Sequence, residues 1–241
     1  MLLEKEMKLA DVIHHDYNLI PVINRFGIML GFGDSSIENI CQEKQINQDF
    51  FLTILNAFHD PQYLDKDSQQ NFSATLLIDY LQQTHNYYLQ NKIPEIECLI
   101  NEMETKAEVD KASYDILRKF FEEYKTELIK HIEREEKRVY PYVIELEKAV
   151  INNTIPPSLL SRIKEYSITS YEDEHESVEE KLKDLKNIII KYLPPSEKQQ
   201  SRYKLLKELT VLEKDLNDHA NIEDLILVPK VELLEKHVTG K

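Results

Sequence analysis

The 241-residue chain carries 30 Lys and Arg against 44 Asp and Glu, which gives a net charge of -14 at pH 7. This negative charge argues against a nucleic acid or an anionic membrane surface as a partner, because both are themselves negative. Charged residues make up 31% of the chain and only 4 residues are glycine. Such a composition favours long helices over sheets and turns.

The sequence predicts neither a membrane span nor a secretion signal. It contains no run of about 18 apolar residues, and charges interrupt the short apolar stretch at the N-terminus. The two cysteines, Cys41 and Cys98, form neither a CxxC pair nor a dense framework. We therefore expect a protein of the cytoplasm.

Residues 1–60 predict a small helical domain, because apolar residues recur there at helical spacing. Gly27, Gly31 and Gly33 cluster in one segment and indicate a loop between its helices. Residues 61–72 are polar and contain a proline, which is typical of a linker. From residue 73 to residue 241 the pattern changes to long amphipathic stretches.

These stretches run over about 73–105, 111–149, 158–192 and 197–238, with Pro94 expected to kink or break the first. The segment 150–157 contains two asparagines and two prolines and predicts a loop. Helices joined by short loops lie antiparallel to their neighbours. The predicted fold is all-α, an up-down-up-down four-helix bundle preceded by a small helical domain.

A pattern of histidine and glutamate occurs twice in the second half of the chain. His131 and Glu135 stand four residues apart, as do His219 and Glu223, and each histidine is followed ten residues later by a proline. Residues four apart lie on one face of a helix. Since His85 and His175 occur at near-equal intervals on the other two stretches, each predicted helix supplies one histidine.

Four imidazoles and two carboxylates suit a first-row metal such as iron, manganese or zinc. Because the two carboxylates can bridge, we expect two metals about 3.5–4 Å apart in the bundle core. A single pair of this spacing would more simply be a solvated ion pair, but the repeat favours a metal site. A metal-free polar core of His–Glu pairs is the remaining alternative, and its burial would be costly.

Two further acids extend the pattern. Glu127 precedes His131 by one helical turn, and Glu174 is adjacent to His175. Such acids can orient a ligand imidazole, line a path for metal entry, or belong to a wet surface. All three interpretations stay open at this point.

The motifs carry a resemblance to a known family. Thr84-His85, HIEREE with a later YP, Asp173 to His175, and DHANIEDLILVP resemble the haemerythrin-like domain of the repair-of-iron-centres family. The resemblance covers about residues 73–238. The N-terminal 60 residues are similar to the small helical domain, of the ScdA type, that precedes it in that family.

The resemblance implies two non-haem iron ions, bridged by an oxo group and by the two glutamates, in a centre with four His and two Glu ligands. By motif these ligands are His85, His131, Glu135, His175, His219 and Glu223. Glu127 and Glu174 match acids along an iron or solvent channel. The implied function is repair of iron–sulfur clusters after nitrosative or oxidative stress, by iron donation or by binding or reducing nitric oxide. The alternative is a module that binds or senses oxygen or nitric oxide without turnover.

The N-terminal domain departs from the family pattern. Where that family typically has Cys-Cys-Gly-Gly in a loop, this chain has Met29–Gly33 without a cysteine. Cys41 alone cannot form a vicinal thiol pair, so we expect a docking or dimerisation role in place of thiol chemistry. Candidate partners are a diatomic ligand (NO or O2), damaged iron–sulfur apoproteins and a second copy of the chain, with no nucleic acid and no membrane.

Overall fold

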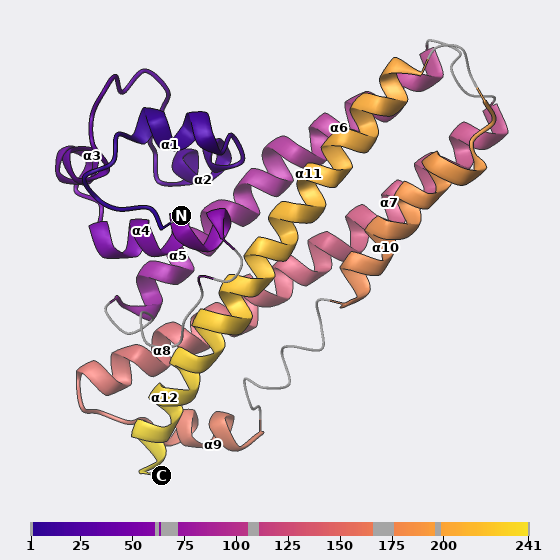
Figure 1. The fold of residues 1–241 in the computed structure, drawn as a ribbon. Coiled ribbons are helices and arrows are strands. Elements are labelled where there is room, and N and C mark those ends of the chain that lie inside the picture. The colour runs from indigo at the N-terminus through magenta and orange to yellow at the C-terminus, as the bar shows by residue number, and fades with distance from the viewer. Residues whose placement is uncertain are drawn as a thin grey trace. The chain divides into compact units, whose positions relative to one another are not determined.

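The computed structural model describes residues 2–60, 63, 72–105, 111–165, 176–195 and 199–240. Within these ranges every named element is helical (Figure 1), apart from an isolated antiparallel bridge between Lys8 and Ser36. The predicted all-α class is therefore confirmed. No described helix combines the length and the apolarity that crossing a membrane requires.

The N-terminal segment folds into short helices around buried aromatic side chains. Its helices are α1 (Leu9–His15), α2 (Leu19–Arg25), α3 (Ile37–Lys44) and α4 (Gln48–His59). Asn47 begins α4 by accepting a hydrogen bond from the backbone N–H of Phe50 at 2.9 Å, which satisfies one of the free donors of the first turn. Phe50 and Phe51 of α4 are almost completely buried, so burial of apolar area drives this segment together.

The longer helices follow in four runs. The first is α5 (Ala74–Tyr87), η2 (Tyr88–Lys92) and α6 (Ile93–Thr105), and the second is α7 (Lys111–Arg134), η3 (Glu135–Val139) and α8 (Tyr140–Ile151). The third comprises α9 (Pro157–Glu165), α10 (Glu176–Asn187) and η5 (Ile188–Tyr192), with residues 166–175 outside the described ranges. The fourth is α11 (Gln200–Ile222), η6 (Glu223–Leu227) and α12 (Val228–Thr239).

The segments group into two compact units. The first comprises Met1–Thr84, Val143–Ile168 and Asn221–Lys241, and the second comprises His85–Tyr142 and Thr169–Ala220. Because these units are groups of contacting segments and not stretches of chain, the predicted domain boundaries at residues 60 and 73 stay predictions. Of the predicted linker 61–72, only residues 63 and 72 are described.

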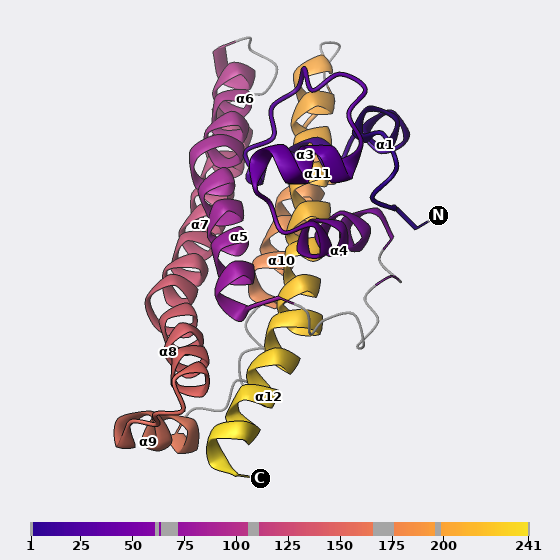
Figure 2. The ribbon, with the colours of Figure 1, turned by 90° about the vertical axis from the view of Figure 1, so that its left-hand side faces the viewer.

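The second unit is a bundle of four antiparallel helices. Helices α6, α7, α10 and α11 lie side by side, and the colour gradient shows that neighbours along the chain run in opposite directions (Figures 1 and 2). One buried stripe of α7, which includes Leu117, Phe121, Tyr124 and Leu128, faces the common core. These positions recur every three or four residues, which is the spacing of one helix face. The up-down-up-down arrangement predicted from the loops is present in this unit.

Within the first unit, the N-terminal helices hold α5 through Tyr80. The ring of Phe26 lies 5.0 Å from the Tyr80 ring, and the Arg25 guanidinium donates a hydrogen bond of 3.3 Å to the Tyr80 hydroxyl. Tyr80 and Arg25 are both buried. This contact ties the small N-terminal helices to the helix that carries His85.

Each long run contains a π-turn that ends two residues before a proline. In each turn, the backbone N–H of the residue before the proline bonds the carbonyl five residues earlier. A proline has no N–H to donate, and its ring clashes with the carbonyl four residues earlier. The wider turn relieves this clash. The first run therefore continues past Pro94 to Thr105, which excludes the break that was one of the two outcomes expected there.

A buried carboxylate from α8 holds the beginning of α5. Glu147 accepts hydrogen bonds from the backbone N–H groups of Ala74 and Thr75, at 2.6 and 2.9 Å, and from the Thr75 hydroxyl at 2.6 Å. Negative charge is favourable at a helix N-terminus, where backbone donors have no partner within the helix. The carboxylate thus acts together with a local cap, Ser73, whose hydroxyl accepts a hydrogen bond of 3.1 Å from the backbone N–H of Leu76.

We predict that Glu147→Leu lowers the free energy of unfolding by about 1–3 kcal/mol, because the variant leaves buried N–H groups without an acceptor. Chemical denaturation followed by circular dichroism measures this change. Glu123→Leu serves as the control, since Glu123 is an exposed residue of α7. Equal stability of the two variants would contradict the capping role.

Candidate metal centre

Three of the predicted ligand histidines meet in the interior of the second unit. His85 lies near the end of α5, His131 near the end of α7 and His219 near the end of α11. Their exposed fractions are 2%, 6% and 4%, and Glu135, the first residue of η3, is fully buried. Side chains that are usually solvated are thus gathered where water has little access.

The Glu135 carboxylate lies between two of these imidazoles. Its Oε2 atom is 3.0 Å from Nε2 of His85, and its Oε1 atom is 2.9 Å from Nε2 of His131. The Nε2 atom of His85 also lies 3.2 Å from Nε2 of His219. Three ring nitrogens and both oxygens of one carboxylate therefore converge on a shared interior space.

Glu223, the predicted ligand that belongs to the first unit, has a similar local setting to Glu135. It is fully buried, begins η6, and follows His219 by one turn of a continuous helical run. Within the second unit, His85, Glu135 and His219 belong to a group able to hold a metal ion. The potential ligand atoms of His85, Glu135 and His219 all lie within 4.8 Å of one another. The spacing of four residues in the sequence is the local reason why each acid shares a face with its histidine.

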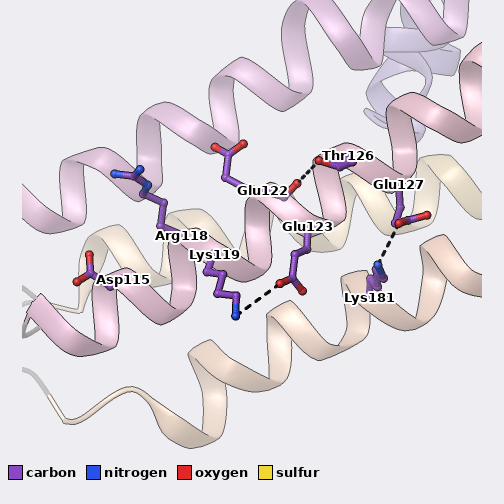
Figure 3. A pocket seen from close by; sticks show the side chains of 8 residues that line it. All are labelled: Asp115, Arg118, Lys119, Glu122, Glu123, Thr126, Glu127 and Lys181. Atoms are coloured by element: carbon purple, nitrogen blue, oxygen red, sulfur yellow. Dashed lines mark hydrogen bonds and ion pairs between the residues drawn. The ribbon is translucent and has the colours of Figure 1, made fainter.

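The remaining predicted site residues have different placements. His175 and Glu174 lie outside the described residues, so their roles stay predictions. Glu127 lines an open groove along α7 and α10, where its carboxylate points towards Lys181 (Figure 3). It lies 3.4 Å from Lys181 and 3.6 Å from Lys130. These two cations, Lys181 first, lower the pKa of the Glu127 carboxyl, and its role in a channel or beside a ligand stays a prediction.

Two contacts to His85 were not assigned from the sequence. Glu136 Oε1 lies 2.9 Å from Nδ1 of His85, on the side of the ring away from Nε2. The Tyr140 ring stacks on the imidazole with centroids 5.6 Å apart, and its hydroxyl lies 3.4 Å from Nε2. The only sequence signal for Glu136 is its position directly after Glu135, which does not say where its side chain points.

The charges of this group fit a bound cation. When the Nδ1–H group of His85 donates a hydrogen bond to Glu136, the neutral ring has its lone pair on Nε2. That lone pair then faces the ionised Glu135 carboxylate, and the two repel. Either a proton on Glu135, which then donates a hydrogen bond to Nε2, or a metal ion between the groups removes the repulsion. Ionised carboxylates are very costly to bury alone, so a cation beside them stabilises the group. Histidine nitrogens and carboxylate oxygens are a suitable donor set for a first-row metal.

A small cavity adjoins the imidazoles inside the second unit. Its lining residues are His85, Tyr88, Leu128, His131, Ile132, Val178, Leu216, His219 and Ala220. The space open to the centre of a water-sized molecule is about 20 Å³, where roughly 10–15 Å³ suffices for one water. Most of the lining is aliphatic, so the cavity suits a small molecule of low polarity.

The buried cysteine is unsuited to thiol chemistry. Cys41 is buried in α3, and this burial raises the pKa of its thiol to about 11. The reactive thiolate is therefore scarce at neutral pH. Cys98 is exposed on α6 and belongs to the other compact unit.

The model of one protein family matches a large part of the chain. It is described as the Hemerythrin HHE cation binding domain and matches residues 77–231, which is more than half of the 241 residues. This range includes all six ligand positions predicted from the sequence. A comparison with curated proteins finds no match.

Proposed function

Because the chain belongs to the haemerythrin HHE cation-binding family, we propose that it is a non-haem di-iron protein that binds nitric oxide or oxygen. The residues proposed to hold the iron are His85, His131, Glu135, His175, His219 and Glu223. Six protein ligands for two metals leave coordination positions for a small ligand. Bound iron would supply these positions and the capacity to exchange electrons with the gas.

The observation that carries this proposal is the apolar cavity beside the three imidazoles. Its volume of about 20 Å³ accommodates a diatomic molecule and excludes organic substrates, whose sites usually span hundreds of cubic ångströms. Leu128, Ile132 and Val178 present hydrocarbon to it, which disfavours water over a weakly polar gas. The protein therefore selects which molecule reaches the proposed metal ligands by its size and its polarity.

The motif resemblance to the repair-of-iron-centres family supports a more specific role. We infer that the protein acts in the cytoplasm under nitrosative or oxidative stress and helps to restore damaged iron–sulfur clusters. Two routes fit the site: removal of nitric oxide by binding or reduction, and donation of iron to a damaged apoprotein. Both routes need the same set of His and Glu ligands.

We predict that the protein, purified without added metal, contains about two iron atoms per chain. The double variant His131→Ala/His219→Ala should lose this iron, because it removes two converging nitrogen donors. Elemental analysis measures the content. The matched control is His14→Ala/His237→Ala, which removes two exposed histidines and should keep the iron. Unchanged iron in the first double variant would refute the assignment.

Filling the cavity should separate gas binding from iron binding. We predict that Val178→Phe weakens nitric oxide binding about tenfold, or about 1.4 kcal/mol, while the iron content stays near that of the wild type. Gas titration of the reduced protein measures the affinity. The control is Ile190→Phe, at a position 64% exposed on η5. If Val178→Phe binds the gas as tightly as the control, the cavity is not the binding space.

A second candidate function is gas sensing without turnover. It is favoured by the contact of Arg25 and Phe26 with Tyr80, because Tyr80 lies on α5 just before the ligand His85. The Thr84 hydroxyl also donates a hydrogen bond of 3.1 Å to the Tyr80 carbonyl. A shift of His85 on ligand binding would therefore reach the N-terminal helices along one continuous helix.

Sensing predicts that nitric oxide binds in stoichiometric amount without being consumed, and that amide hydrogen exchange in α1–α4 changes on binding. Arg25→Gln should reduce that change, because it weakens the contact with Tyr80. An electrode that follows nitric oxide in solution distinguishes the candidates. Continued consumption of the gas with an external reductant favours the repair function over sensing.

A further inference from the structure

Two successive carboxylates of η3 hold the same imidazole from its two edges. Glu135 lies 3.0 Å from Nε2 of His85, and Glu136 lies 2.9 Å from Nδ1. Successive residues of an α-helix point in well-separated directions, and the wide π-turn that begins at Glu135 reduces this divergence. The repeated motif again has two acids in succession, Glu223 and Asp224.

The two contacts on His85 have different chemical consequences. A neutral imidazole has one nitrogen that donates a proton and one that accepts. A carboxylate that accepts a hydrogen bond from Nδ1–H keeps the proton on Nδ1 and the lone pair on Nε2. Nε2 is the nitrogen that faces Glu135 and His219. A ring held in this way is ready to bind a metal through Nε2 without first moving a proton.

We propose that Glu136 is a positioning residue, which fixes the tautomer and the orientation of His85 so that Nε2 is available as a ligand. The proposal deepens the proposed iron function and rests on it. Glu136 has an exposed fraction of 29% for its side chain, so it stands between the buried centre and solvent. It would touch neither iron nor gas, and it acts only through His85. Carboxylates in this position typically change metal affinity by about 10–100-fold when they are removed.

Nitrogen NMR of metal-free protein with ¹⁵N-labelled histidine tests the tautomer, at a pH above the ordinary histidine range. A His85→Gln variant identifies the signals of His85. We expect the wild type to carry the His85 proton on Nδ1, Glu136→Leu to lose this preference, and Glu136→Gln to keep part of it, since its amide oxygen still accepts. A wild-type proton on Nε2 overturns the proposal.

Competition with a chelator for ferrous iron provides the second measurement. Glu136→Leu should bind iron about 10–100-fold more weakly than the wild type, with Glu136→Gln in between. Glu133→Leu is the matched control, because Glu133 is on the same helical run but is exposed and pairs with Lys137 at 3.0 Å. Affinity of Glu136→Leu within twofold of the control overturns the proposal.

The two measurements, nitrogen NMR and chelator competition, test the role of Glu136 separately from the proposed function. If the wild type took up no iron, the proposed function would fail, and the proton position in the metal-free protein would still decide the role of Glu136. Loss of the tautomer preference without unfolding is a change that a purely structural residue does not cause. Circular dichroism of each variant checks the fold.

Discussion

The Glu135 carboxylate is buried between the imidazoles of His85 and His131, at 3.0 and 2.9 Å. A buried carboxylate is tolerated only where positive charge and hydrogen-bond donors meet it. This requirement constrains the helices that carry the three groups, because a small rotation of one helix would separate oxygen from nitrogen. The apolar residues of the bundle set that rotation, so core packing and site geometry depend on each other.

The prolines of the long helices are linked to the position of the buried glutamates. Glu135 and Glu223 each occupy the first position of a π-turn, and their carbonyls accept the N–H of the residue just before a proline. The fixed distance from histidine to proline in both motifs thus reflects a turn that begins at the acidic residue of the motif. π-turns inside α-helices are frequently associated with functional sites. Here the turn lets the chain place a proline in a long helix and bring two successive acids, Glu135 and Glu136, to the two edges of His85.

The site combines two environments that favour different ligands. On one side the polar groups of Glu135, Glu136 and Tyr140 surround His85. On the other side, aliphatic side chains leave a cavity of about 20 Å³. The polar side suits a metal ion, and the apolar side suits a small gas. Their direct proximity supports the proposed gas-binding iron centre over a metal-free polar core.

The helical class, the long helices and the sharing of a face by each His–Glu pair follow from the sequence alone, because they depend on the local period of a helix. The family match agrees with the haemerythrin-like resemblance drawn from the motifs. Contacts between helices could not be derived in this way. The approach of Glu136 to Nδ1 of His85, the stacking of Tyr140 and the cavity at Val178 depend on how far each helix is rotated and shifted against its neighbours. That arrangement results from packing among many side chains far apart in the chain, and only the tertiary structure decides it.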